Sequence, residues 1–171
     1  MLDVKKILNS NWFKRTYLAI SLALLGIGLY SVFDPEPFLK FGYSGIFVFN
    51  ALGGVGTFLI PALSSKMNIW ILALATALGM GINDSISWLV GRGGSEAVYK
   101  VKWADKAERF LDKYGWKSLF VLSAIPLPYD AIGLVSGYLG MDYLKFFVPT
   151  VFGKFIRMLL IGFGYQWLIN L

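Results

Sequence analysis

Long stretches without a charged residue constrain the fold of this chain more than any other feature of its sequence. Residues 16–33, 41–65 and 67–83 contain no Asp, Glu, Lys or Arg, and 57% of the 171 residues are hydrophobic. Such stretches approach or exceed the roughly 20 apolar residues that a helix needs to cross a bilayer. Since no polar linker divides the chain, we expect an all-α, polytopic membrane protein in which residues 1–171 form a single membrane domain.

The apolar stretch over residues 118–141 is interrupted in its middle. Pro126 and Pro128 lack the backbone N–H that a continuous helix uses, and Asp130 adds a carboxylate that lipid disfavours. Irregular backbone at membrane depth is tolerated only where protein buries it or where it lines a cavity. This stretch therefore predicts a re-entrant hairpin, with Pro126 and Pro128 at its tip.

The distribution of basic residues predicts how the chain crosses the membrane. Lysines and arginines cluster before residue 16 and again between residues 92 and 117, so the positive-inside rule places both regions, and the N-terminus, in the cytoplasm. The chain returns there only if one further apolar stretch is re-entrant, and its many glycines favour 41–65, with Asn50 and Pro61 at the hairpin tip. The expected order is a span over 16–33, a re-entrant hairpin over 41–65, a span over 67–91, a re-entrant hairpin over 118–141 and a span over 143–170.

Two hairpins that enter from opposite sides would make the halves inverted-topology repeats, an architecture that forms substrate sites between broken helices. The sequence trace of such a repeat is weak. TALGMGIND at 76–84 and TVFGKFIR at 150–157 share a Thr-x-x-Gly that precedes a charged residue.

Residues 93–115 differ from the rest because apolar side chains fall on one helical face and lysines on the others. The pattern predicts an amphipathic helix on the membrane surface, and a solvated basic helix is the alternative. Arg92, just before it, is predicted to anchor the preceding span among cytoplasmic headgroups.

Four charged residues inside apolar segments are the candidate site: Asp84, Asp130, Lys154 and Arg157. Lys154 and Arg157 are three residues apart and share a helical face, so they can pair with either carboxylate. A purely structural ion pair and a pocket for an anionic headgroup both remain open. Free backbone groups at the tips, near Asn50, Pro61, Pro126 and Pro128, could bind an ion or a phosphate or merely reverse the chain.

Several classes of function are disfavoured by composition. The chain contains no Cys and no His, which removes disulfides, thiol nucleophiles and imidazole or thiolate metal sites. We expect no metal, no cofactor and no enzymatic activity, because Asp84 and Asp130 have no flanking catalytic groups. The net charge of +6 fits orientation in the membrane and lipid headgroups better than nucleic acid.

The order and spacing of several motifs resemble the DedA/VTT family of membrane proteins, also called the SNARE-associated Golgi protein family, and within it a short branch with Pro-x-Pro-x-Asp. The resemblance covers roughly residues 42–170. It rests on Gly79, Asp84, Trp88, Gly91 and Arg92, then Tyr114-Gly115, Pro126-Leu127-Pro128-Tyr129-Asp130, Gly137, Met141, Gly153, Lys154 and Arg157. The sequence departs from the family's usual pattern at Asn50, at Pro61-Ala62-Leu63 and at Ser123 and Asp130.

The resemblance implies two re-entrant hairpins in inverted repeats and movement of membrane lipids, as a phospholipid scramblase or a polyprenyl-phosphate flippase. It also implies functional roles for Asp84, Asp130 and Arg157. A proton- or ion-coupled transporter of small solutes and a non-transporting membrane scaffold are the alternatives. Proton coupling and homo-oligomerisation are left open, and the expected location is the cell membrane of a prokaryote.

Overall fold

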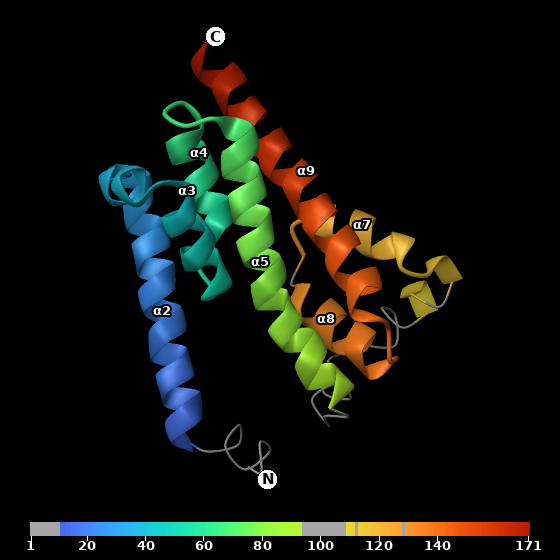
Figure 1. The fold of residues 1–171 in the computed structure, drawn as a ribbon. Helices are drawn as coiled ribbons and strands as arrows, with labels where there is room; N and C mark the ends of the chain where they lie inside the picture. Colours follow the sequence, from blue (N-terminus) through green and yellow to red (C-terminus); the bar gives the residue numbers. More distant parts are fainter. Residues whose placement is uncertain (1–10, 94–108, 112, 128) are drawn as a thin grey trace.

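The computed structural model describes residues 11–93, 109–111, 113–127 and 129–171, and all regular elements in these residues are helical (Figure 1). The predicted all-α class is thus confirmed. Most of the predicted amphipathic helix over 93–115 lies outside the described residues. The helices are α2 (Asn11–Phe33), α3 (Glu36–Ala51), the 3-10 helix η1 (Gly56–Phe58), α4 (Leu59–Ser64), α5 (Ile69–Arg92), α7 (Lys117–Ala124), α8 (Tyr129–Tyr138) and α9 (Tyr143–Ile169).

The two helices α5 and α9 form the centre of the molecule, and both are long and apolar enough to cross a membrane. Their 24 and 27 residues correspond to about 36 and 40 Å at 1.5 Å per residue. Each begins at a side-chain cap, because the carboxamide of Asn68 and the carboxylate of Asp142 accept hydrogen bonds from the first backbone N–H groups of their helices.

The remaining helices flank this central pair, with α2, α3 and α4 on one side and α7 and α8 on the other (Figure 1). Within the first flank, α3 packs along α5 and α4 packs along α9. Within the second, α7 packs along α9 and α8 packs along α5. Each flanking pair of helices therefore contacts both central helices.

Both stretches predicted as hairpins contain a break between two helical arms. In the first, α3 ends at Ala51, the backbone turns through Gly53 with φ 99°, and η1 and α4 follow. We call residues 52–55 the first break. Pro61 does not lie at this tip as predicted but in the first turn of α4, where a proline costs little because the N–H there has no helical partner.

In the second stretch α7 ends at Ala124 and α8 begins at Tyr129. We call residues 125–128 the second break. Pro126 lies within it, as predicted, whereas Pro128 lies outside the described residues. The missing N–H of proline and its steric conflict with the preceding turn explain why the helix stops here.

Two apolar clusters stabilise the two sides of the molecule. The first joins α3, α4 and the start of α5 to Met158 and Leu159 of α9, and the second joins α7 and α8 to Trp88 and Phe146. Many large apolar side chains point outward instead, as expected for helices that contact lipid. On α5 these are Trp70, Ile71, Leu74, Ile82, Ile86 and Leu89.

Candidate functional site

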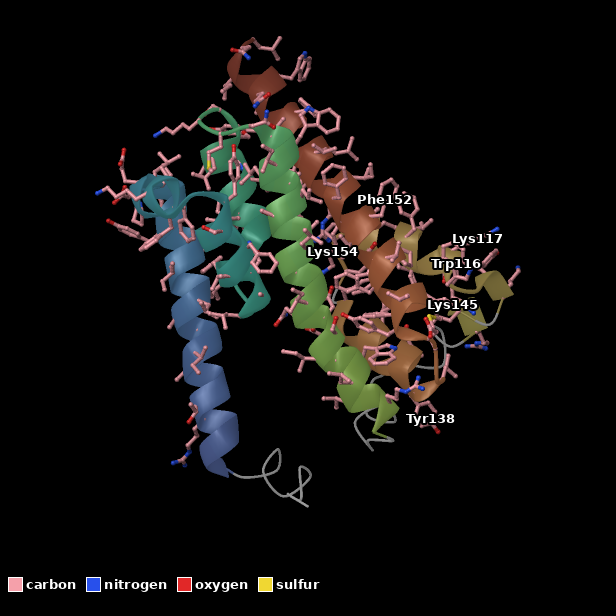
Figure 2. All side chains as sticks on the ribbon, viewed as in Figure 1. Trp116, Lys117, Tyr138, Lys145, Phe152 and Lys154 are labelled. Atoms are coloured by element: carbon pink, nitrogen blue, oxygen red, sulfur yellow. The ribbon has the colours of Figure 1, made fainter. Side chains whose placement is uncertain are left out.

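Asp84 and Lys154 meet between the two central helices. α5 approaches α9 closely at Gly81, where a β-carbon would stand 2.5 Å from Val151 Cγ2. Near this crossing, Asp84 Oδ2 lies 2.7 Å from Lys154 Nζ, and the two side chains are only 6% and 3% exposed. Lys154 accordingly lies between α5 and α9, whereas Phe152 of α9 points outward (Figure 2). The predicted charges thus form a buried ion pair that joins the two central helices.

An aromatic ring completes the surroundings of the lysine. Lys154 Nζ lies 4.9 Å from the centre of the Tyr129 ring, within the range of a cation–π interaction. Tyr129 belongs to the first turn of α8, so the ammonium group contacts α5, α8 and α9 together. A movement of α8 would therefore change the environment of the buried cation.

Asp130 is separate from this ion pair. It is exposed in the first turn of α8, and its Oδ1 accepts a hydrogen bond from Ser87 Oγ of α5 at 3.2 Å. Among the described residues it forms no ion pair with Lys154 or Arg157. Of the pairings that the sequence allowed, the structure selects Lys154 with Asp84.

Small residues place α8, and with it Asp130, directly against α5. A β-carbon on Gly137 would overlap the backbone oxygen of Trp88, and one on Gly91 would overlap the backbone oxygen of Leu134. Gly133 and Gly137 are spaced as in the small-xxx-small pattern that lets membrane helices approach closely. This packing explains how Ser87 reaches the carboxylate of Asp130.

Arg157 contacts the second break. Its Nη1 donates a hydrogen bond to the backbone oxygen of Ile125 at 3.2 Å, just beyond the end of α7. A cation near a helix C-terminus interacts favourably with the partial negative charge there. The Nε–H of Arg157 is buried and has no partner among the described groups. Arg157 thus holds the second break against α9 and retains a donor for a further acceptor.

Three neutral polar side chains support this break, and sequence reasoning did not select them as site residues. The hydroxyl oxygens of Tyr129 and Thr150 lie 2.7 Å apart, and Thr150 also donates to the backbone oxygen of Phe146. Ser123 Oγ lies within hydrogen-bond distance of the backbone oxygens of Phe120 and Pro149. A tyrosine between Pro128 and Asp130 was the available sequence signal for this polar cluster.

Asn50, predicted at the first hairpin tip, lies near the C-terminal end of α3 and is completely buried. Its Nδ2 donates to the backbone oxygen of Ile46 at 2.7 Å, while its Oδ1 has no partner among the described groups. Thr76 of α5 is also completely buried, and its Oγ1 has no described partner either. The first break is therefore polar but uncharged.

Arg92, predicted to anchor α5 among lipid headgroups, contacts other parts of the protein in the structure. Its Nη1 donates to the backbone oxygens of Gly140 and Met141, both at 3.2 Å, and its guanidinium lies 5.2 Å from the centre of the Trp88 ring. Arg92 thus ties the end of α5 to the turn between α8 and α9. Its predicted contact with lipid headgroups stays a prediction.

Two long apolar helices that meet through a buried ion pair, each flanked by a broken helical segment, define a helical membrane protein with a polar centre. The chain belongs to the VTT domain family, whose model matches residues 41–166. It is 27% identical over 132 residues to the protein DedA of Escherichia coli K12 and to DedA of Escherichia coli O157:H7. The predicted resemblance to the DedA/VTT family is thereby confirmed.

The match with the two DedA proteins covers 75% of this chain and 58% of the length of each relative. The chain thus spans less than two thirds of the curated relatives that it matches. The search of solved structures returned no significant match.

Proposed function

We propose that the protein moves lipids across the bilayer, with the headgroup following a polar path past Asp84, Lys154, Arg157 and Asp130 while the acyl chains stay in the membrane. The observation that carries this proposal is the buried Asp84–Lys154 ion pair, beside which Arg157 has an unpaired donor and Asp130 an exposed carboxylate. Ionisable groups within membrane segments are costly and usually mark a substrate or ion pathway.

The chemistry of Arg157 suits a phosphate-bearing headgroup. A guanidinium presents its N–H donors in a rigid fork that matches phosphate oxygens. Only one donor of Arg157 has a partner among the described groups, the backbone oxygen of Ile125, and the Nε–H is unpaired. A phospholipid or polyprenyl-phosphate headgroup that reached this point would find an available cationic donor.

Matching features along α5 and α9 support an inverted repeat. The same number of residues separates the helix caps Asn68 and Asp142, the buried Thr76 and Thr150, and Gly79 and Gly153. A β-carbon on Gly79 would overlap the end of α3 at the Phe47 backbone oxygen, and one on Gly153 would overlap the end of α7 at the Phe120 backbone oxygen. Each central helix therefore crosses its own broken segment at an equivalent glycine.

The same spacing relates Arg92, which donates to the turn after α8, to Gln166, whose Nε2 donates to the backbone oxygen of Ser64, the last residue of α4. The helix packing corresponds as well. α3 packs on α5 as α7 packs on α9, and α4 packs on α9 as α8 packs on α5. These correspondences support two halves exchanged by a two-fold axis in the membrane plane, with two re-entrant hairpins that face one another.

Reconstitution into vesicles with a fluorescent phospholipid tests the proposal. Bleaching from outside with a membrane-impermeant reductant should remove inner-leaflet fluorescence faster than in empty vesicles. Arg157→Ala should abolish the difference, because the headgroup loses its cationic donor. Lys145→Ala, which removes an exposed cation from the same helix, is the matched control and should preserve lipid movement. Equal rates for the wild type and Arg157→Ala would remove Arg157 from the path.

A coupled transporter of a small solute is the second candidate, favoured by two carboxylates, the buried Asp84 and the exposed Asp130, on the neighbouring helices α5 and α8. It predicts a substrate-induced proton flux that Asp130→Asn eliminates. Lipid movement at every pH and without a gradient would instead favour the first candidate. A scaffold without transport predicts that Asp84→Asn lowers thermal stability and changes no flux.

A further inference from the structure

Two buried side-chain oxygen atoms belong to residues that pack against Gly56, which directly follows the first break. Asn50 Oδ1, from the end of α3, and Thr76 Oγ1, from α5, belong to side chains with no exposed surface, and neither atom has a hydrogen-bond partner among the described groups. The hydrogen bond from Asn50 Nδ2 to Ile46 fixes which end of the carboxamide remains free. Buried polar atoms in an apolar surrounding are costly unless a partner satisfies them.

Gly56 brings these side chains together. A β-carbon on Gly56 would overlap Asn50 Oδ1 and would stand 2.7 Å from Thr76 Cγ2, so both side chains reach the same point of the backbone. The C-terminal end of α3 adjoins this point, and a helix C-terminus carries a partial negative charge. Neutral oxygens beside a helix C-terminus are an environment that favours a cation.

At the second break, the corresponding polar groups have partners from the protein itself. Arg157 supplies its own cationic donor to the backbone oxygen at the end of α7, and Tyr129 satisfies the hydroxyl of Thr150. The spacing that relates Thr76 to Thr150 relates Asn83 to Arg157. Asn83 is neutral, and its Oδ1 lies 3.5 Å from the position of a β-carbon on Gly53. The first break thus has the same layout without a cation of its own.

We propose that the first break binds a monovalent alkali cation, such as Na⁺, through Asn50 Oδ1, Thr76 Oγ1 and backbone oxygens of residues 52–55. Broken membrane helices hold Na⁺ in this way, with unwound carbonyls and a helix C-terminal end. Because the side-chain ligands are neutral, the site suits a monovalent ion better than Ca²⁺ or Mg²⁺, which are bound mainly through carboxylates. The site uses none of the four charged residues of the proposed lipid path, and binding is measurable without transport.

Thermal unfolding of the full chain in detergent tests the proposal. Tm should rise saturably with NaCl or KCl relative to N-methyl-D-glucamine chloride of the same ionic strength, because a ligand of the folded state stabilises it. Thr76→Val keeps the side-chain shape but removes a ligand, and should weaken the apparent Na⁺ affinity about tenfold or more. Thr150→Val is the matched control, which should lower the basal Tm yet keep the response to Na⁺.

Two further variants keep the test decisive if Thr76→Val does not fold. Asn83→Arg should replace the bound ion by an internal cation and remove the Na⁺ response. Asn50→Asp should increase Na⁺ affinity, measured by equilibrium binding of ²²Na⁺. Absence of a saturable Na⁺ effect in the wild type would mean that the site holds only water and would overturn the proposal. Equal Na⁺ responses of Thr76→Val and Thr150→Val would overturn it as well.

Discussion

The two breaks share a layout but differ in chemistry. At each, a helix ends beside a glycine of a central helix and a completely buried threonine lies within reach. At the second break, Arg157 and Tyr129 provide partners for the exposed backbone and the threonine hydroxyl. At the first break, Asn50 and Thr76 retain unpaired oxygens. A repeated backbone arrangement can therefore carry a charged site in one half and a neutral site in the other.

The positions of the ion pair likewise differ in chemistry from the positions that correspond to them in the other half. The spacing that relates the two central helices pairs Asp84 with Met158 and Lys154 with Met80. Met158 belongs to the first apolar cluster and Met80 packs against it, whereas Asp84 and Lys154 form the buried ion pair. The positions that carry the ion pair in one arrangement therefore carry methionines in the corresponding one. Apolar side chains thus occupy in one half the positions that the ion pair occupies in the other.

Exchange of the ion pair for methionines should give the largest effect. Lys154→Met leaves the Asp84 carboxylate buried without a partner and should lower the free energy of unfolding by about 3 to 5 kcal/mol. The double variant Asp84→Met/Lys154→Met copies Met80 and Met158 and should recover most of this loss, because an apolar pair needs no counter-charge. Chemical unfolding in detergent measures both. A double variant as unstable as Lys154→Met would show that methionines cannot replace the ion pair, and that its positions are not equivalent to those of Met80 and Met158.

Alanine substitutions at the two equivalent glycines should give the next largest effect. Gly79→Ala and Gly153→Ala would each push a β-carbon into the end of a neighbouring helix, and should each cost about 1 to 3 kcal/mol. Gly164→Ala on α9 is the control, since no atom lies within 4 Å of its added β-carbon. It should be neutral or slightly stabilising. Thermal unfolding measures both losses. If only one of the two substitutions lowered the stability, the two glycines would not be equivalent.

Removal of each threonine hydroxyl should change the free energy of unfolding less, and by different amounts at the two breaks. Thr150→Val deletes the hydrogen bond with Tyr129 and should cost about 0.6 to 1.7 kcal/mol, the range for such bonds between membrane helices. Thr76→Val in Na⁺-free buffer should cost almost nothing, because the hydroxyl that it removes has no described partner. Similar losses in both variants, measured by chemical unfolding without alkali cations, would contradict the difference between the breaks.

The contacts at the ends of the central helices should matter least. Arg92→Gln copies Gln166 and keeps an N–H donor for the turn after α8, so its expected cost is about 0.5 kcal/mol or less. Arg92→Leu removes the donor and should cost about 1 kcal/mol. Thermal unfolding of the two variants checks the order. A larger loss for Arg92→Gln than for Arg92→Leu would show that apolar packing, and not the hydrogen bond, dominates at this turn.

The sequence predicted much of the site because its strongest signals are local. A carboxylate or an ammonium group within an apolar helix must find a partner, which marked Asp84, Lys154 and Arg157 without knowledge of the fold. A proline disfavours a continuous helix, which marked the second break at Pro126, although α9 accommodates Pro149 in its interior. Thr76 and Thr150 carried no comparable signal, because neutral hydroxyl groups are tolerated in many environments, and Tyr129 was marked only by its place between Pro128 and Asp130.

The sequence by itself determined the helical membrane class, the interruption of helices near the two breaks and the burial of charge in α5 and α9. These follow from hydropathy and backbone chemistry over short stretches. Only the tertiary structure decided that Lys154 pairs with Asp84 and not with Asp130, that Pro61 lies in α4, and that Asn50 and Thr76 converge at Gly56. Such contacts join residues far apart in sequence, and they depend on close helix crossings at glycines such as Gly79, Gly81 and Gly153.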